Sequence, residues 1–117
     1  MKKVLIVDDE EDVCQMLAKI IRRKGFEVLI CGDGLTAVEM FKTHKPDVTF
    51  LDLHIPKLTG WQVLDEIRKI DAGAKIYFVT GDHNEAEELK AKNVSVNGYV
   101  LKPIDLGEFV KIVEENK

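Results

Sequence analysis

The feature of this sequence that most constrains its fold is a fivefold alternation between short apolar runs and amphipathic segments. Short continuous apolar runs rich in β-branched residues indicate strands that are buried on both faces. The segments between them repeat their apolar residues every three or four positions, which indicates helices that pack on those strands. Because parallel strands are joined by right-handed crossovers, five such units predict a doubly wound α/β fold, a five-stranded parallel sheet with helices on both faces.

Ordinary start and stop signals place the ends of these elements. Gly25 ends the first helix and Pro46 ends the second, while Asp33 and Asp105 are placed to act as helix N-caps. The fourth helix is the most polar of the set. We expect strands at residues 4–7, 26–30, 48–51, 75–79 and 99–101, with a helix after each, the first at about residues 12–24 and the fourth at about residues 84–93.

The composition limits what the chain can be. Its 117 residues match a single domain, residues 1–117, with no visible linker, and 45% hydrophobic with 32% charged residues is typical of a folded globular protein. Seventeen basic and 21 acidic residues give a net charge of -4, which argues against nucleic acid as a direct partner. No signal peptide opens the chain and no apolar run could cross a bilayer, so we expect a cytoplasmic protein with no membrane association.

The two cysteines, Cys14 and Cys31, are too few for a disulfide framework and lack the spacing of metal ligands. Free thiols are the ordinary state of cysteine in a reducing compartment. We therefore expect both residues to be free, in keeping with a cytoplasmic location.

Polar residues follow four of the five predicted strands. Asp8 and Asp9 follow the first, Asp52 follows the third, Thr80 the fourth and Lys102 the fifth, whereas the second ends without an obvious functional group. In doubly wound sheets the ligand site lies just beyond the carboxyl ends of the strands. The first, third and fourth strands are central or nearly central in either common strand order. We therefore expect these side chains to meet at one edge of the sheet.

Three carboxylates at one site repel one another, and burying them without a counter-charge is costly. Lys102 supplies one positive charge. A hard divalent cation with oxygen ligands would supply the rest, and Mg²⁺ suits an open site that retains water. Mn²⁺ is the alternative metal.

Four segments in this order resemble the receiver domain of two-component response regulators, of the kind found in chemotaxis regulators. They are residues 7–10, 51–60, 79–81 and 101–103, and the resemblance extends over essentially the whole chain. It implies a flavodoxin-like sheet with strand order 2-1-3-4-5 and five helices. It also implies that residues 1–117 are one receiver domain with no output domain in this chain.

The resemblance assigns Asp52 as the residue that accepts a phosphoryl group, beside Mg²⁺ or Mn²⁺. Asp9 would ligate the metal directly, and Asp8 would act mostly through metal-bound water. Asp52 and the backbone carbonyl of His54 would complete the protein ligands. A transition-metal site built from His54 and His83 is the competing interpretation, which the oxygen-rich set of neighbours disfavours.

The resemblance also implies a switch. Thr80 and Lys102 would bind phosphoryl oxygens, and Tyr99 would move inward after Thr80, which changes the face made by the fourth helix, the fifth strand and the fifth helix. Asp82 and His54 would control how fast the phosphate is hydrolysed. The peptide before Pro103 is commonly cis in this family. Each residue also has a structural explanation, such as simple packing for Tyr99.

The partners implied are a histidine kinase or a histidine phosphotransfer protein as phosphodonor, and an output domain or effector as target. A homodimer that forms on phosphorylation would use the last strand and helices. The chain would not be an enzyme beyond its own phosphorylation and autodephosphorylation.

Three other functions remain open from the residues. The first is a receiver-like interaction module that is never phosphorylated. The second is a phosphatase of the haloacid-dehalogenase type, which would need a second acid at the position of His54. The third is a flavin binder, although no phosphate-binding loop rich in glycine or hydroxyl groups follows the first strand.

Overall fold

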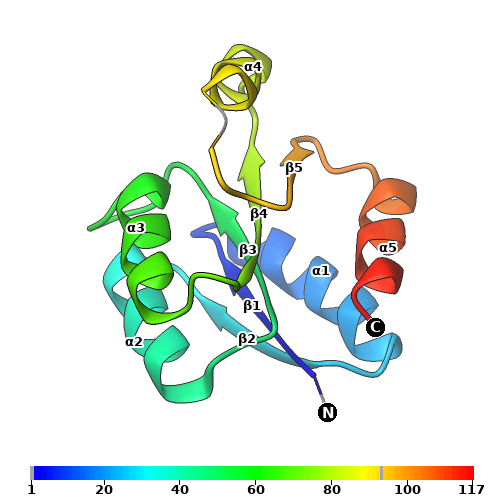
Figure 1. The fold of residues 1–117 in the computed structure, drawn as a ribbon. Coiled ribbons are helices and arrows are strands. Elements are labelled where there is room, and N and C mark those ends of the chain that lie inside the picture. The colour runs from blue at the N-terminus through cyan, green and yellow to red at the C-terminus, as the bar shows by residue number, and fades with distance from the viewer. Residues whose placement is uncertain (1, 93) are drawn as a thin grey trace.

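Five strands and five helices alternate along the part of the chain that the computed structural model describes, residues 2–92 and 94–117 (Figure 1). The predicted elements are all confirmed, with ends that differ by one or two residues; the predicted end of the fourth helix, Asn93, lies outside the described residues. The strands are β1 (Lys3–Val7), β2 (Glu27–Cys31), β3 (Val48–Asp52), β4 (Lys75–Thr80) and β5 (Gly98–Leu101). The helices are α1 (Glu11–Arg23), α2 (Gly34–His44), α3 (Gly60–Ile70), α4 (His83–Ala91) and α5 (Leu106–Glu115).

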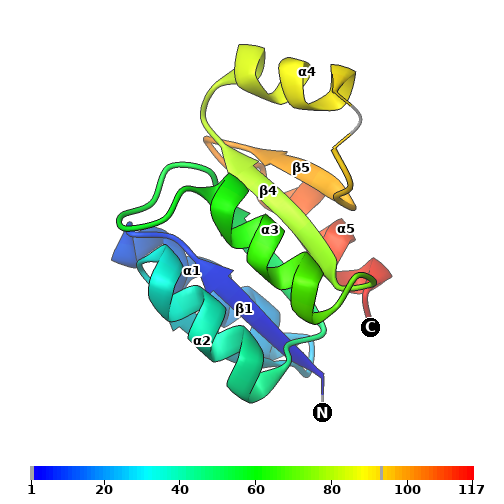
Figure 2. The ribbon, with the colours of Figure 1, turned by 60° about the vertical axis from the view of Figure 1, so that its left-hand side comes forward.

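The strands form one parallel sheet in the order β2-β1-β3-β4-β5. The predicted flavodoxin-like strand order is therefore confirmed. Figures 1 and 2 show α2 and α3 on one face of the sheet and α1 and α5 on the other, while α4 lies alongside the β5 edge of the sheet.

Two apolar layers hold the helices on the sheet because neighbouring strand residues point to opposite faces. On β1, Leu5 and Val7 belong to the layer beneath α2 and α3, whereas Val4 and Ile6 belong to the layer beneath α1 and α5. All four side chains are nearly inaccessible to solvent. This two-sided burial explains why the strands are continuous apolar runs.

Side-chain caps fix where several helices begin. Asp33 accepts a hydrogen bond from the backbone N–H of Thr36, and Asp105 caps α5 in the same way, which confirms both predicted N-caps. Thr59 begins α3 with a reciprocal capping box. Asp82 caps α4 by accepting the backbone N–H groups of the residues two and three positions later. The last of these caps places the first turn of α4 directly after the end of β4.

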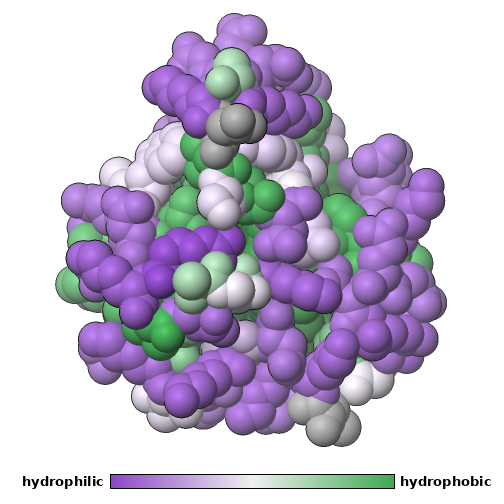
Figure 3. All heavy atoms as spheres, in the orientation of Figure 1, coloured by the Kyte–Doolittle hydropathy of each residue, from purple (hydrophilic) through white to green (hydrophobic). Residues whose placement is uncertain are grey.

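The fourth helix has few buried residues. Only Ala86 and Leu89 are buried among its residues, and hydrophilic side chains cover it in the view of Figure 3. An element with few buried apolar contacts opens at a lower free-energy cost than the core does. Within the described ranges no helix has both the length and the apolar character that crossing a membrane requires.

Candidate functional site

The carboxyl ends of four strands bring the predicted polar residues to one edge of the sheet. Asp52 and Thr80 are the last residues of β3 and β4, and Asp8 and Lys102 directly follow β1 and β5. The strand register keeps these ends level, with Val7 beside Leu51. Asp8, Asp52 and Thr80 are each less than 7% exposed. Buried polar groups of this kind need partners, and Asp8 and Asp52 find one in Lys102 while Thr80 finds one in Glu85.

Lys102 lies at the centre of the cluster. Its Nζ is 3.0 Å from a carboxylate oxygen of Asp8, 3.0 Å from one of Asp52 and 2.8 Å from Oε1 of Glu10. Burial alone would lower the pKa of Lys102, but the hydrogen bonds to Glu10, Asp52 and Asp8 outweigh it and raise that pKa above its ordinary value. The backbone N–H of Lys102 donates to the carbonyl of Thr80, and the Lys102–Pro103 peptide is cis, as the resemblance implies. The ammonium is therefore charged and held between the carboxylates.

The carboxylate oxygens of Asp8, Glu10 and Asp52 lie within 4.8 Å of one another. Burial raises the pKa of Asp8, against the opposing hydrogen bonds that it accepts from the backbone of Glu10 and from Lys102. One ammonium does not balance three carboxylates, and clustered hard oxygens are the donors that Mg²⁺ prefers. The residues present therefore fit a divalent cation.

Asp9 lies outside that group of three. Its side chain is exposed, whereas Asp8 points into the site. Its direct contact with a metal stays a prediction. The backbone of His54 borders the site, because its N–H donates to Oδ1 of Asp52 across 2.9 Å. With Lys102 on Oδ2, both carboxylate oxygens of Asp52 are held by donors.

A second polar group surrounds Thr80. Its hydroxyl donates to Oε1 of Glu85 across 2.9 Å and accepts the backbone N–H of Asp82 across 3.1 Å. The same Glu85 oxygen lies 3.0 Å from Nε2 of His54. The structure thus places Asp82 beside Thr80 and links His54 to Thr80 through Glu85, but the carboxylate of Asp82 is engaged as the cap of α4.

Sequence reasoning missed Glu10 and Glu85. A signal for Glu85 was present: an acid three residues after an Asp N-cap lies in the first helical turn and points back toward the start of the helix. In this protein that direction leads to Thr80. Glu10 carried no such signal, because its contact with Lys102 depends on a side-chain rotamer beyond the end of β1.

Tyr99 is half-buried between β4 and α4. Its ring centroid lies 6.2 Å from that of Phe78, which also packs against Trp61, and the ammonium of Lys90 lies 5.6 Å from the Tyr99 ring. Burial raises the pKa of the Tyr99 hydroxyl. Tyr99 therefore contacts a helix with only two buried residues, and Trp61 is close enough to report a change there.

The two thiols are free, as predicted, and both are buried. Burial is the main cause that raises the pKa of Cys14 to about 11 and that of Cys31 to about 12. The thiolate is the reactive form of cysteine. Neither residue is therefore a nucleophile near neutral pH.

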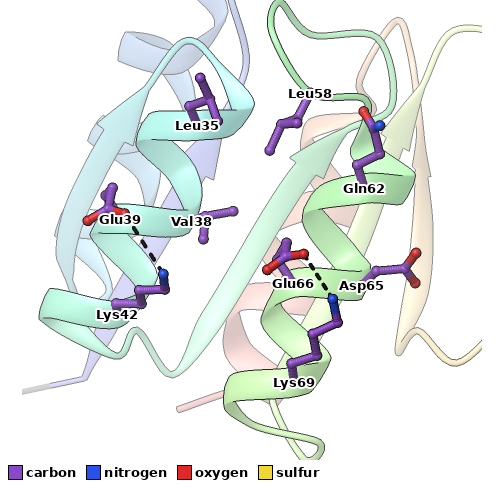
Figure 4. Close-up of a pocket in the computed structure, with 9 residues that line it drawn as sticks. All are labelled: Leu35, Val38, Glu39, Lys42, Leu58, Gln62, Asp65, Glu66 and Lys69. Carbon is purple, nitrogen blue, oxygen red and sulfur yellow. Dashed lines mark hydrogen bonds and ion pairs between the residues drawn. The ribbon is translucent and has the colours of Figure 1, made fainter.

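A separate groove of about 450 Å³ runs between α2 and α3 (Figure 4). Leu35, Val38 and Leu58 supply its apolar wall. The carboxylate of Glu39 pairs with a lysine on its own helix, and so does that of Glu66. None of the residues at the strand ends lines this groove, so it is not part of the site.

Gly60 is required where α3 passes the end of β3. A β-carbon there would lie 2.8 Å from the Cα of Leu53 and 2.9 Å from the carbonyl oxygen of Asp52. We expect Gly60→Ala to lower the free energy of unfolding by about 1 kcal/mol, because the steric conflict with backbone outweighs the helical preference for alanine. Urea denaturation checks this, with Gly73→Ala as the loop control; equal or greater stability of Gly60→Ala would contradict it.

Known proteins with similar sequences and structures support the resemblance that the sequence motifs indicate. The family model of the response regulator receiver domain matches residues 4–114. The chain is 33% identical over 115 residues to the chemotaxis protein CheY of Thermotoga maritima, covering 97% of this chain and 96% of that protein. It is 32% identical over 114 residues to the regulatory protein AtoC of Escherichia coli K12, covering 97% of this chain and 25% of AtoC. The chemotaxis response regulator CheY4 of Vibrio cholerae superposes with a TM-score of 0.88 at 25% identity, over 100% of this chain and 99% of CheY4.

The chain spans between 25% and 48% of the length of four longer relatives, AtoC among them.

Proposed function

This chain belongs to the family of response regulator receiver domains of two-component systems, and we propose that it is a phosphoacceptor switch whose phosphorylated residue is Asp52. The observation that carries the proposal is the setting of that carboxylate. It is 6% exposed, with Lys102 on one oxygen and the backbone N–H of His54 on the other. A buried acid held by fixed donors at the edge of the sheet is oriented to act as a nucleophile.

In the proposed reaction a carboxylate oxygen of Asp52 attacks the phosphorus of a phosphohistidine. The new O–P bond forms as the N–P bond breaks, and the electron pair of that bond remains on the imidazole nitrogen. Catalysis of phosphoryl transfer rests mainly on position and on charge placed around the phosphoryl oxygens. Lys102 supplies one positive charge there, and Thr80 would supply a directed hydrogen bond.

A divalent cation would be held by Asp8 and Asp52, with Asp9 and the backbone carbonyl of His54 as the further ligands implied by the family. Mg²⁺ or Mn²⁺ would neutralise negative charge on the phosphoryl oxygens. The cluster of three carboxylates around one ammonium supports this assignment. The Lys102 ammonium would compete with the cation for these carboxylates, because it pairs with Asp8, Glu10 and Asp52.

Phosphorylation adds a charge of roughly -1.5 to -2 at Asp52. We expect Thr80 to move toward that charge, Tyr99 to follow, and the face made by α4, β5 and α5 to change. The small number of buried residues in α4 supports the proposal that this helix moves. His54 and Asp82 would set the rate of hydrolysis through the attacking water.

The proposed donor is a histidine kinase or a histidine phosphotransfer protein. The names of the relatives suggest two kinds of target, an output domain as in a transcriptional regulator or a separate effector as for a chemotaxis protein. We propose residues 1–117 as one receiver domain acting in the cytoplasm as a signalling switch. It would have no direct contact with nucleic acid or membrane and would form a homodimer only when phosphorylated.

Incubation with acetyl phosphate and Mg²⁺ tests the proposal. We expect intact-mass spectra to show one phosphoryl adduct, and Trp61 fluorescence to change when beryllofluoride, a phosphoryl mimic, is added. Asp52→Asn should lose both responses because amide oxygen is a poor nucleophile. Asp65→Asn, a charge-matched change on the exposed face of α3, should keep both.

Wild-type protein that forms no adduct would support the interaction module instead. Steady release of phosphate from an external phosphoester would support the phosphatase, although His54 stands where that reaction needs a second acid.

A further inference from the structure

Glu85 contacts two separate segments of the site through a single carboxylate oxygen. Oε1 accepts the Thr80 hydroxyl at 2.9 Å and lies 3.0 Å from Nε2 of His54. Thr80 ends β4, His54 follows β3, and Glu85 belongs to the first turn of α4. The Glu85 side chain is 24% exposed, so the contact is partly shielded from water. The start of α4 is thus tied to the ends of two central strands.

The Thr80 hydroxyl has only one proton to donate. That proton is directed to Glu85, and the oxygen of the same hydroxyl accepts the backbone N–H of Asp82. In the proposed function Thr80 must donate to a phosphoryl oxygen on Asp52. Glu85 and the phosphoryl group are therefore alternative acceptors for one donor, and both are anionic.

We propose that Glu85 is a positioning residue that holds Thr80 and α4 in the unphosphorylated arrangement and is displaced when the phosphoryl group recruits the hydroxyl. This inference rests on the proposed function of Asp52 and adds an opposing contact to it. When Thr80 is released, the hydrogen bond between Thr80 and Glu85 in the first turn of α4 is lost. Because only Ala86 and Leu89 of that helix are buried, losing the contact between Glu85 and Thr80 would readily change the position of α4.

The test measures the affinity for beryllofluoride in saturating Mg²⁺, followed by Trp61 fluorescence. Removal of the competing acceptor in Glu85→Ala tightens binding on the order of tenfold, the value of a hydrogen bond to a charged group. Glu85→Gln keeps an oxygen acceptor without the charge, so its gain is smaller. Glu88→Ala removes an exposed acid from the same helix and leaves the affinity unchanged.

A double-mutant cycle separates this contact from a general effect of charge. In a Thr80→Ala background the donor is gone, so Glu85→Ala produces no further gain. Mg²⁺ affinity without beryllofluoride is the same in wild type and Glu85→Ala, because Glu85 lies outside the carboxylate cluster.

Three results overturn the inference. They are an unchanged affinity in Glu85→Ala, a gain that persists without the Thr80 hydroxyl, or an equal gain in Mg²⁺ affinity. Wild-type protein that binds no beryllofluoride in Mg²⁺ overturns the proposed function itself and the inference with it.

Discussion

Lys102→Met is expected to lower the free energy of unfolding by about 3 kcal/mol in the absence of divalent cations, because removing one partner of a buried ion pair leaves uncompensated charge. The Lys102 side chain is 19% exposed and its ammonium contacts three carboxylates. Methionine fills a similar volume without the charge. The measured loss of stability then comes from the missing charge interactions more than from changed packing.

Addition of Mg²⁺ should narrow the gap between the variant and wild type. Without the ammonium, Asp8, Glu10 and Asp52 form a more negative site, so the variant should bind the cation more tightly and gain more stability from it. Urea denaturation at matched ionic strength, with and without Mg²⁺, measures both effects. Lys111→Met on the exposed face of α5 is the control and should change neither. A loss of equal size in both conditions would show that Lys102 and the cation do not share a site.

The edge of the sheet that carries the site could be predicted from sequence because the geometry of a parallel sheet is strict. Once Val4–Val7 and the other apolar runs are read as parallel strands, Asp8, Asp52, Thr80 and Lys102 must lie at one edge. The structure places all four there. Such a prediction needs only the period of the strands and the direction of the chain.

Contacts made by side chains beyond the strand ends could not be predicted in the same way. Glu10 reaches Lys102 and Glu85 reaches Thr80 through particular rotamers, which depend on neighbours distant in sequence. Asp82 shows the converse case. Its position beside Thr80 was expected, but the open backbone N–H groups of α4 engage its carboxylate as a cap.

Phe50→Ala is expected to cost about 4 kcal/mol of stability, the largest loss among these variants, because it removes a buried aromatic ring and leaves a cavity. Phe50 is 1% exposed and lies on β3, two residues before Asp52. Its ring centroid is 4.9 Å from that of Phe109 on α5 and 5.4 Å from that of Tyr77 on β4. The ring therefore joins α5 to the two central strands that carry the site.

Urea denaturation should show a lower midpoint with little change in slope, which marks a loss of stability in a protein that still unfolds cooperatively. Phe50→Leu keeps most of the apolar volume and should lose about 1 kcal/mol. Because residues 50 and 52 of one strand point to the same face of the sheet, a cavity at Phe50 also loosens the packing on which the orientation of Asp52 depends. We therefore expect slower phosphoryl adduct formation in Phe50→Ala even where the variant is fully folded. A rate equal to that of Phe50→Leu would show that the site is held by Lys102 and the backbone alone.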